Sequence, residues 1–160
     1  MNPVLVRMFE HNRWANLALV DACLGMDRSV VERAVDGTFG AIRPTLAHIA
    51  GAEERYLLAL EGEQRGAAVP FETTDPSLTD IRIHLDRSGR GLVEVAGRLD
   101  GDPTLTGTHR GAPYAMPASL FLLQAVNHAT EHRAQIATTL TQLGIEPPVL
   151  DGWAFTAAGS

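Results

Sequence analysis

The sequence predicts an all-α protein, a four-helix bundle, and three observations support this fold class. Apolar residues recur at steps of three and four along long segments, which places them in a stripe on one side of a helix. Four such segments of about 20 residues each are separated only by irregular pieces. No internal repeat occurs, and 160 residues with 45% hydrophobic content fit a single domain over 1–160 with its own core.

The first helix is expected to begin at Asn2 and Pro3, a capping residue followed by the residue best tolerated in a first turn. Gly25 weakens the last turn, so the helix is expected to end near residue 24. Its apolar stripe comprises Leu5, Met8, Asn12, Ala15, Leu19, Ala22 and Met26. Residues 36–40, with two glycines and a threonine, are predicted to form a loop.

The second helix is predicted over about 41–61, where Pro44 is tolerable because it lies in the first turn. Residues 64–74 show no periodicity and read as a linker. The third helix is expected to start after residues 75–77 and to end near 100–103. Its stripe comprises Leu78, Ile81, Leu85, Ser88, Leu92, Val95 and Leu99.

Residues 104–116 are irregular and are expected to contain a short extended or hairpin-like piece. The fourth helix is predicted from Pro117 to about residue 143, and Trp153 and Phe155 in the tail are expected to pack back onto the bundle. The short connections favour simple up-down-up-down topology. The connection between the second and third helices is the longest, so this topology is not forced.

The composition and the absence of certain motifs argue against several classes of function. The net charge of −6 and the pI near 5.4 argue against a protein that coats nucleic acid. All 13 basic residues other than histidine are Arg, so lysine Schiff-base chemistry is excluded. No signal peptide and no run of about 18 apolar residues occurs, so we expect no membrane span and a cytoplasmic location. Phosphate-binding loops, GxSxG elbows, zinc-finger cysteine patterns and paired ExxH motifs are also missing from the sequence.

The strongest chemical signal is a pair of histidines, His128 and His132, in the fourth predicted helix. Residues four apart are turned about 40° from each other and rise about 6 Å, so the two imidazoles can converge on one ion. The same helix face carries Ile136 and Thr139, which points the pair towards the interior. Two hydrogen-bonded or partly exposed histidines are the alternative interpretation of this spacing.

A third candidate ligand, His48, lies in the second predicted helix between the small residues Thr45 and Ala52, which leave room for an ion. Taken alone, His48 is more typical of a core or edge histidine. Together with His128 and His132 it would form a three-nitrogen site. Three protein ligands leave positions open for water, which is typical of catalytic metal sites.

Other polar residues near this pattern have weaker cases. His11 either approaches the site or only supports it. Glu131 is a partner of a ligand, a substitute ligand or an exposed carboxylate. Gln135 either orients a bound water or substrate or packs with a local hydrogen bond. His84 and His109 are expected to be solvated or structural.

Several blocks of the sequence resemble the DinB family of DinB/YfiT-like metalloenzymes. They lie at residues 8–16, 37–53, 128–136 and 144–151 and together span nearly the whole chain. The resemblance implies a four-helix bundle, often a homodimer, with a metal held by three histidines. The family's ligands map onto His48, His128 and His132. Related families include transferases and isomerases that use low-molecular-weight thiols.

The leading functional expectation is a metal-dependent enzyme with one divalent transition metal ion, zinc or nickel first and iron or manganese as alternatives. It would act on a small-molecule substrate as a thiol-dependent S-transferase or as a hydrolase. The alternative is a non-catalytic protein that binds metal or small ligands in a stress response; a purely structural ion is a third hypothesis. Leu122, Val126 and Leu140 face away from the histidines and could pack against another helix or against a second subunit.

Overall fold

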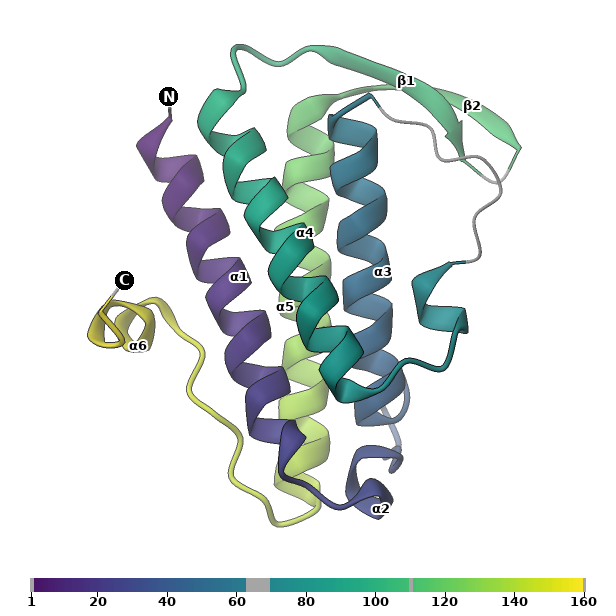
Figure 1. The fold of residues 1–160 in the computed structure, drawn as a ribbon, viewed down its shortest axis with the longest axis vertical. Coiled ribbons are helices and arrows are strands. Elements are labelled where there is room, and N and C mark those ends of the chain that lie inside the picture. The colour runs from purple at the N-terminus through teal and green to yellow at the C-terminus, as the bar shows by residue number, and fades with distance from the viewer. Residues whose placement is uncertain (1, 63–69, 110, 160) are drawn as a thin grey trace.

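The computed structural model describes residues 2–62, 70–109 and 111–159. Four long helices pack side by side and a two-stranded hairpin covers one end, which confirms the predicted four-helix bundle (Figure 1). These helices are α1 (Pro3–Leu24), α3 (Ile42–Leu60), α4 (Leu78–Arg98) and α5 (Ala118–Gln142). In the described part of the chain, the helices are all too short or too polar to span a lipid bilayer.

Local capping fixes where two of the helices begin. The side chain of Asn2 accepts hydrogen bonds from the backbone N–H groups of Val4 and Leu5, and Pro3 occupies the first helical position. At the start of α4, Ser77 and Asp80 cap each other's backbone N–H groups in a capping box. Both starts agree with the sequence prediction because these signals are local.

The predicted up-down-up-down topology is wrong, because α3 and α4 run in the same direction. Ion pairs join Glu54 to Arg87 and Glu61 to Arg98, so position along α3 increases with position along α4. In Figure 1, α3 ends near the hairpin, whereas α4 begins towards the opposite end of the bundle. The long connection between the two helices permits this arrangement, whereas a short connection would have forced them to be antiparallel.

Short elements occupy the connections. Strands β1 (Thr104–His109) and β2 (Ala112–Pro117) pair antiparallel, with Thr104 opposite Pro117, which confirms the hairpin-like piece. The structure also contains α2 (Arg28–Val31), the 3₁₀ helix η1 (Phe71–Thr73) and α6 (Gly152–Ala157), which the sequence did not predict. Of the predicted linker over 64–74, residues 64–69 lie outside the described residues, and η1 lies in the remainder.

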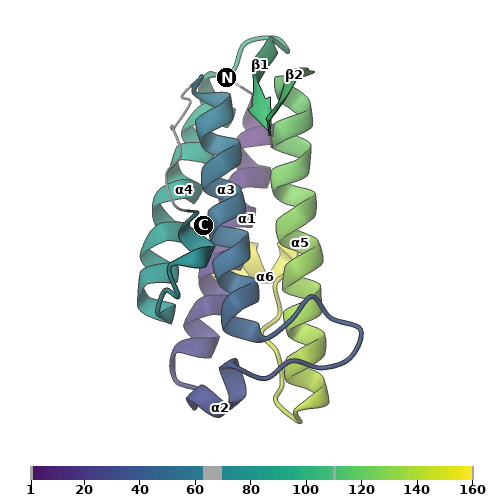
Figure 2. The same ribbon diagram turned by 90° about the vertical axis from the view of Figure 1, so that its right-hand side faces the viewer.

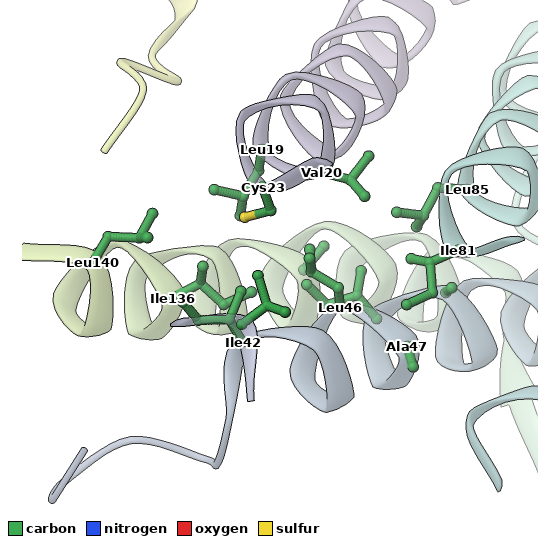
Figure 3. Packing of buried hydrophobic residues seen from close by; sticks show 14 residues of the cluster. Leu19, Val20, Cys23, Ile42, Leu46, Ala47, Ile81, Leu85, Ile136 and Leu140 are labelled. Carbon is green, nitrogen blue, oxygen red and sulfur yellow. The ribbon is translucent and has the colours of Figure 1, made fainter. Parts of the chain in front are cut away.

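The main apolar core lies between the four helices, and Figure 3 shows its side chains converging from all of them. On α1 the predicted stripe is partly out of phase: Met8 and Ala22 are exposed, whereas Phe9 and Cys23 are buried. On α5, Leu122 and Leu140 are buried within the chain. The second apolar stripe of α5 therefore packs against other helices of the same bundle.

A buried polar network crosses the bundle. Asn12 and Asn16 of α1 each donate a hydrogen bond of 2.7 Å to one oxygen of Glu53, and Ser88 of α4 donates to the other oxygen. Arg133 of α5 donates to the side-chain oxygens of the same two asparagines. Each of the four long helices therefore contributes a polar residue whose hydrogen bonds are made inside the protein.

The C-terminal tail packs onto α1 through His11. The Nε2 of His11 lies 2.9 Å from the backbone oxygen of Leu150, and its ring packs edge-on against Phe155. Phe155 is buried as predicted, but Trp153 is 86% exposed, so the prediction that both aromatic residues pack on the bundle is wrong for Trp153.

Candidate metal centre

Helices α3 and α5 bring the three predicted histidines together. His48 lies in the second turn of α3, and His128 and His132 lie one turn apart on α5. The Nε2 atoms of His48 and His128 are 3.0 Å apart, and one ring nitrogen from each histidine lies within 4.8 Å of the others. The convergence expected from the spacing is therefore present, and this cluster could hold a metal ion.

Gln135 orients one of the three imidazoles. Its Oε1 lies 2.9 Å from Nδ1 of His132, one helical turn away on the same face. Because a side-chain carbonyl oxygen only accepts, this hydrogen bond places the ring proton on Nδ1 and leaves the lone pair on Nε2. The sequence left open whether Gln135 orients a bound water or substrate or packs with a local hydrogen bond, and the contact with His132 is such a local hydrogen bond.

The surroundings keep two of the imidazoles neutral. Burial, with a smaller contribution from the nearby His132, lowers the pKa of His48. Burial likewise lowers the pKa of His128 to about 4, helped by its two histidine neighbours. Neutral imidazole is the form that binds a metal, so no proton must first be removed from these rings near pH 7.

Phe39 packs against the cluster and was not identified from the sequence. Its ring stacks on His48 at a centroid distance of 4.5 Å and meets His132 edge-on at 4.6 Å. Figure 2 shows the loop between α2 and α3, which carries Phe39, extending across the side of α5 before α3 begins. Phe39 is 53% exposed, so it forms an apolar rim between the imidazoles and solvent.

The remaining candidates lie elsewhere. His11 contacts the C-terminal tail, so its role is to support the fold, and Glu131 is exposed on α5. His84 is buried on α4, where it stacks on Phe71. His109 lies at the end of β1. His11, His84 and Glu131 are not part of the three-histidine cluster found in the described residues.

The donor set fits a divalent transition metal. Zinc lies about 2 Å from imidazole ligands, so nitrogens on one ion are about 3–4 Å apart. The observed separations, from 3.0 Å up to at most 4.8 Å, come close to this arrangement. Three neutral nitrogen ligands suit zinc, nickel, copper or iron, and they leave further coordination positions for a small molecule.

Comparisons with known proteins agree with this fold. The model of the DinB family matches residues 1–158. No curated protein matches the chain. Among solved structures, a DinB-like protein from Bacillus cereus is similar with a TM-score of 0.68 and 20% sequence identity, over 91% of this chain and 94% of that chain. This structural likeness concerns the fold, and the family match extends over almost the full length, so the chain belongs to the DinB family.

Proposed function

We propose that this protein is a metal-dependent enzyme that binds one divalent transition metal ion through His48, His128 and His132. The observation that supports the proposal most directly is the convergence of three ring nitrogens within 4.8 Å on helices that are fixed by the core. We propose zinc or nickel as the ion, with iron or manganese as alternatives. When bound, such an ion supplies a positive charge that lowers the pKa of a coordinated water or thiol.

The rest of the site is suited to a small-molecule substrate. His48 and His128 are only partly buried, and Phe39 offers an exposed aromatic surface beside them. An apolar wall next to a polar centre is typical of small-molecule sites. We propose that the substrates include a low-molecular-weight thiol, which would make the protein a thiol-dependent S-transferase, or else that it is a hydrolase.

The metal proposal is tested by elemental analysis of protein purified without a histidine tag. We expect about one ion per chain in the wild type and almost none in His128→Ala, because two remaining nitrogens bind far more weakly. His11→Ala is the matched control and should keep the ion, since His11 contacts the tail and not the cluster. Equal metal content in all three proteins would overturn the assignment.

The enzymatic proposal is tested on the metal-loaded protein with panels of thiols plus electrophiles and of esters plus amides, and products are followed by mass spectrometry. Turnover that disappears in His128→Ala supports an enzyme. Full metal content without turnover on any panel would favour the alternative, a non-catalytic protein that binds metal or small ligands.

We also propose that the protein forms a homodimer. Leu120 and Leu123 on α5 are 41% and 65% exposed, which leaves apolar surface on this helix without a partner in the described part of the chain. Light scattering after size-exclusion chromatography should give twice the mass of the chain, and Leu123→Glu should reduce it to that of one chain. A single-chain mass for the wild type would overturn this proposal.

A further inference from the structure

An exposed aromatic side chain is in direct contact with the histidine cluster. The ring of Phe39 stacks on His48 with 22° between the two ring planes, and it meets His132 edge-on, at centroid distances of 4.5 and 4.6 Å. More than half of the surface of Phe39 reaches solvent, although phenylalanine is most often buried. Phe39 therefore joins the cluster to an apolar face that is open to solvent.

The loop that carries Phe39 is held in place by contacts of its own. The hydroxyl and the backbone N–H of Thr38 donate hydrogen bonds of 2.9 and 3.3 Å to the backbone oxygen of Val35. Arg43, in the first turn of α3, forms an ion pair with Glu32 near the start of the loop. Because these contacts tie the loop to α3, the position of Phe39 does not depend on its ring contacts alone.

The ring contacts also limit how far Phe39 lies from the nitrogens of the proposed metal site. An atom of an imidazole ring lies less than one bond length from the centre of that ring, so the Nε2 atoms of His48 and His132 lie within about 6 Å of the centre of the Phe39 ring. Aromatic pairs interact at centroid distances of roughly 4.5–7 Å. A flat group bound next to these nitrogens is therefore within reach of Phe39.

The stacking geometry leaves the coordinating side of His48 uncovered. The lone pair of an unprotonated imidazole nitrogen lies in the plane of its ring, whereas Phe39 covers the face of the His48 ring. The Nε2 of His48 faces Nε2 of His128 at 3.0 Å. Phe39 thus flanks the proposed metal position without blocking it, and a ligand bound there would have this ring at its side.

Other neighbours of the cluster offer less open surface. Tyr56 meets His128 edge-on at 6.1 Å, but it is half-buried and packs against the apolar core. The carboxylate of Glu72, in η1, occupies the space beside Gly51 of α3. Phe39 is therefore the neighbour best placed to contact the body of a ligand.

We propose that Phe39 determines specificity at the three-histidine centre by stacking on a flat apolar group attached directly to the metal-binding end of the ligand. The proposal rests on the proposed metal-binding function and adds a ligand class to it. Preferred ligands are thiols or other metal-binding molecules that carry an aromatic group next to the binding atoms. Molecules with a small aliphatic group in this place bind more weakly, because they leave the exposed face of Phe39 in water.

The test uses cobalt-loaded protein and two probe ligands, acetohydroxamate and benzohydroxamate. Both bind a metal through the same two oxygens, but the group next to these oxygens is a methyl in the first and a phenyl ring in the second. Binding is followed by the visible absorption of cobalt, and the cobalt content of every sample is measured. The ratio of the two affinities is compared between proteins, so the intrinsic difference between the probes cancels.

Two variants should lower the preference for the phenyl probe to different extents. Phe39→Ala removes the ring and should reduce the affinity ratio about tenfold, as expected for the loss of an aromatic pair and of the apolar area that it buries. Phe39→Leu keeps apolar bulk without a flat face and should give an intermediate ratio. The matched control is Trp153→Ala, which removes an exposed aromatic ring of α6 and should leave the ratio unchanged.

The possible failures are distinguishable. A wild-type protein that takes up no cobalt, or whose cobalt spectrum responds to neither probe, contradicts the proposed open metal site and the specificity role together. If Phe39 only orients His48, Phe39→Ala should weaken both probes by the same factor. An affinity ratio that is equal in wild type and Phe39→Ala, with cobalt bound in both, would therefore overturn the role of Phe39 in specificity alone. If only Phe39→Ala takes up no cobalt, the ratio in Phe39→Leu decides in the same way.

Discussion

The bundle contains two polar clusters, and they are satisfied in different ways. In the network of Glu53 and Arg133, both carboxylate oxygens accept hydrogen bonds from α1 or α4, and the guanidinium donates to side chains of α1. In the cluster of His48, His128 and His132, the ring nitrogens mainly face one another, and Gln135 provides a hydrogen bond to one of them. The first cluster crosses the bundle, whereas the second lies between two helices beside an exposed phenylalanine.

This difference separates polar groups that stabilise the fold from groups suited to a ligand. A buried polar group whose partners are all supplied by the protein fixes how the helices pack. Ring nitrogens that converge mainly on one another can exchange these contacts for an external cation. We therefore expect loss of the Glu53 and Arg133 network to lower stability, and loss of the histidines to affect binding.

The largest expected effect is on stability. Arg133→Met at pH 8 should lower the free energy of unfolding of the metal-free protein by about 3–5 kcal/mol, because the buried carboxylate of Glu53 loses its nearby positive charge. His128→Ala should change it by less than about 1 kcal/mol, since this side chain is only partly buried. Urea denaturation measures both values. If Arg133→Met does not fold, Glu53→Gln is the milder variant to measure. Equal losses of unfolding free energy in the network variants and in His128→Ala would contradict the proposed difference between the two clusters.

A second prediction concerns pH. Burial raises the pKa of Glu53 to about 7 from its usual value of 4.5, although hydrogen bonds from Ser88, Asn12 and Asn16 act in the opposite direction. The folded protein therefore holds this proton more tightly than the unfolded chain. The resulting contribution to stability is complete below about pH 4.5 and is lost as the pH rises through about 7.

Glu53→Gln cannot titrate at this position, so the comparison with the wild type isolates the effect. The stability of the wild type minus that of the variant should fall by on the order of 3 kcal/mol between pH 4.5 and pH 8. Urea denaturation of both metal-free proteins at several pH values measures this difference. A difference that is constant with pH, or that grows as the pH rises, would show that burial does not dominate the titration of Glu53.

The smallest expected effect is on metal affinity, and it tests whether Gln135 orients His132. Gln135→Ala should weaken metal binding about 10–100-fold while the stoichiometry stays at about one, because hydrogen bonds to metal-binding histidines fix their orientation. Competition with a coloured chelator measures the affinity. Gln142→Ala, at the exposed end of the same helix, is the matched control, and equal affinities in the two variants would rule out an orienting role for Gln135.

The parts of the fold that could be predicted from the sequence are those with local causes. Asn2 and Pro3 mark the start of α1, and the apolar period of α4 places Ile81, Leu85 and Leu92 in the core as expected. The relative direction of α3 and α4 could not be predicted, because a long connection permits either one. The three-residue η1 and the six-residue α6 are too short to carry a periodic signal, and they form against other parts of the chain.

The residues of the candidate site likewise fall into those that the sequence predicts and those that only the fold shows. The spacing of His128 and His132 follows from helix geometry. The small neighbours of His48 made it a third candidate, and the resemblance to a known family pointed to the same three residues. Phe39 and Glu72 lie in connecting segments without periodicity, so only the folded arrangement shows that one contacts the imidazoles and the other contacts Gly51. A glycine inside a helix normally only lowers the stability of that helix. The local sequence therefore does not show that Gly51 makes room for the side chain of Glu72.

The parallel arrangement of α3 and α4 has a consequence for how such a bundle can diversify. In the connection between α3 and α4, η1 packs against α3, while the shorter loop before α3 brings Phe39 to the imidazoles. Core helices thus carry the three clustered imidazoles, and irregular segments carry the groups around them. Loops tolerate substitution and exchange far better than packed helices. Exchange of these two segments between bundles of this kind should therefore change which molecules are accepted while the proposed ion-binding capacity is inherited unaltered.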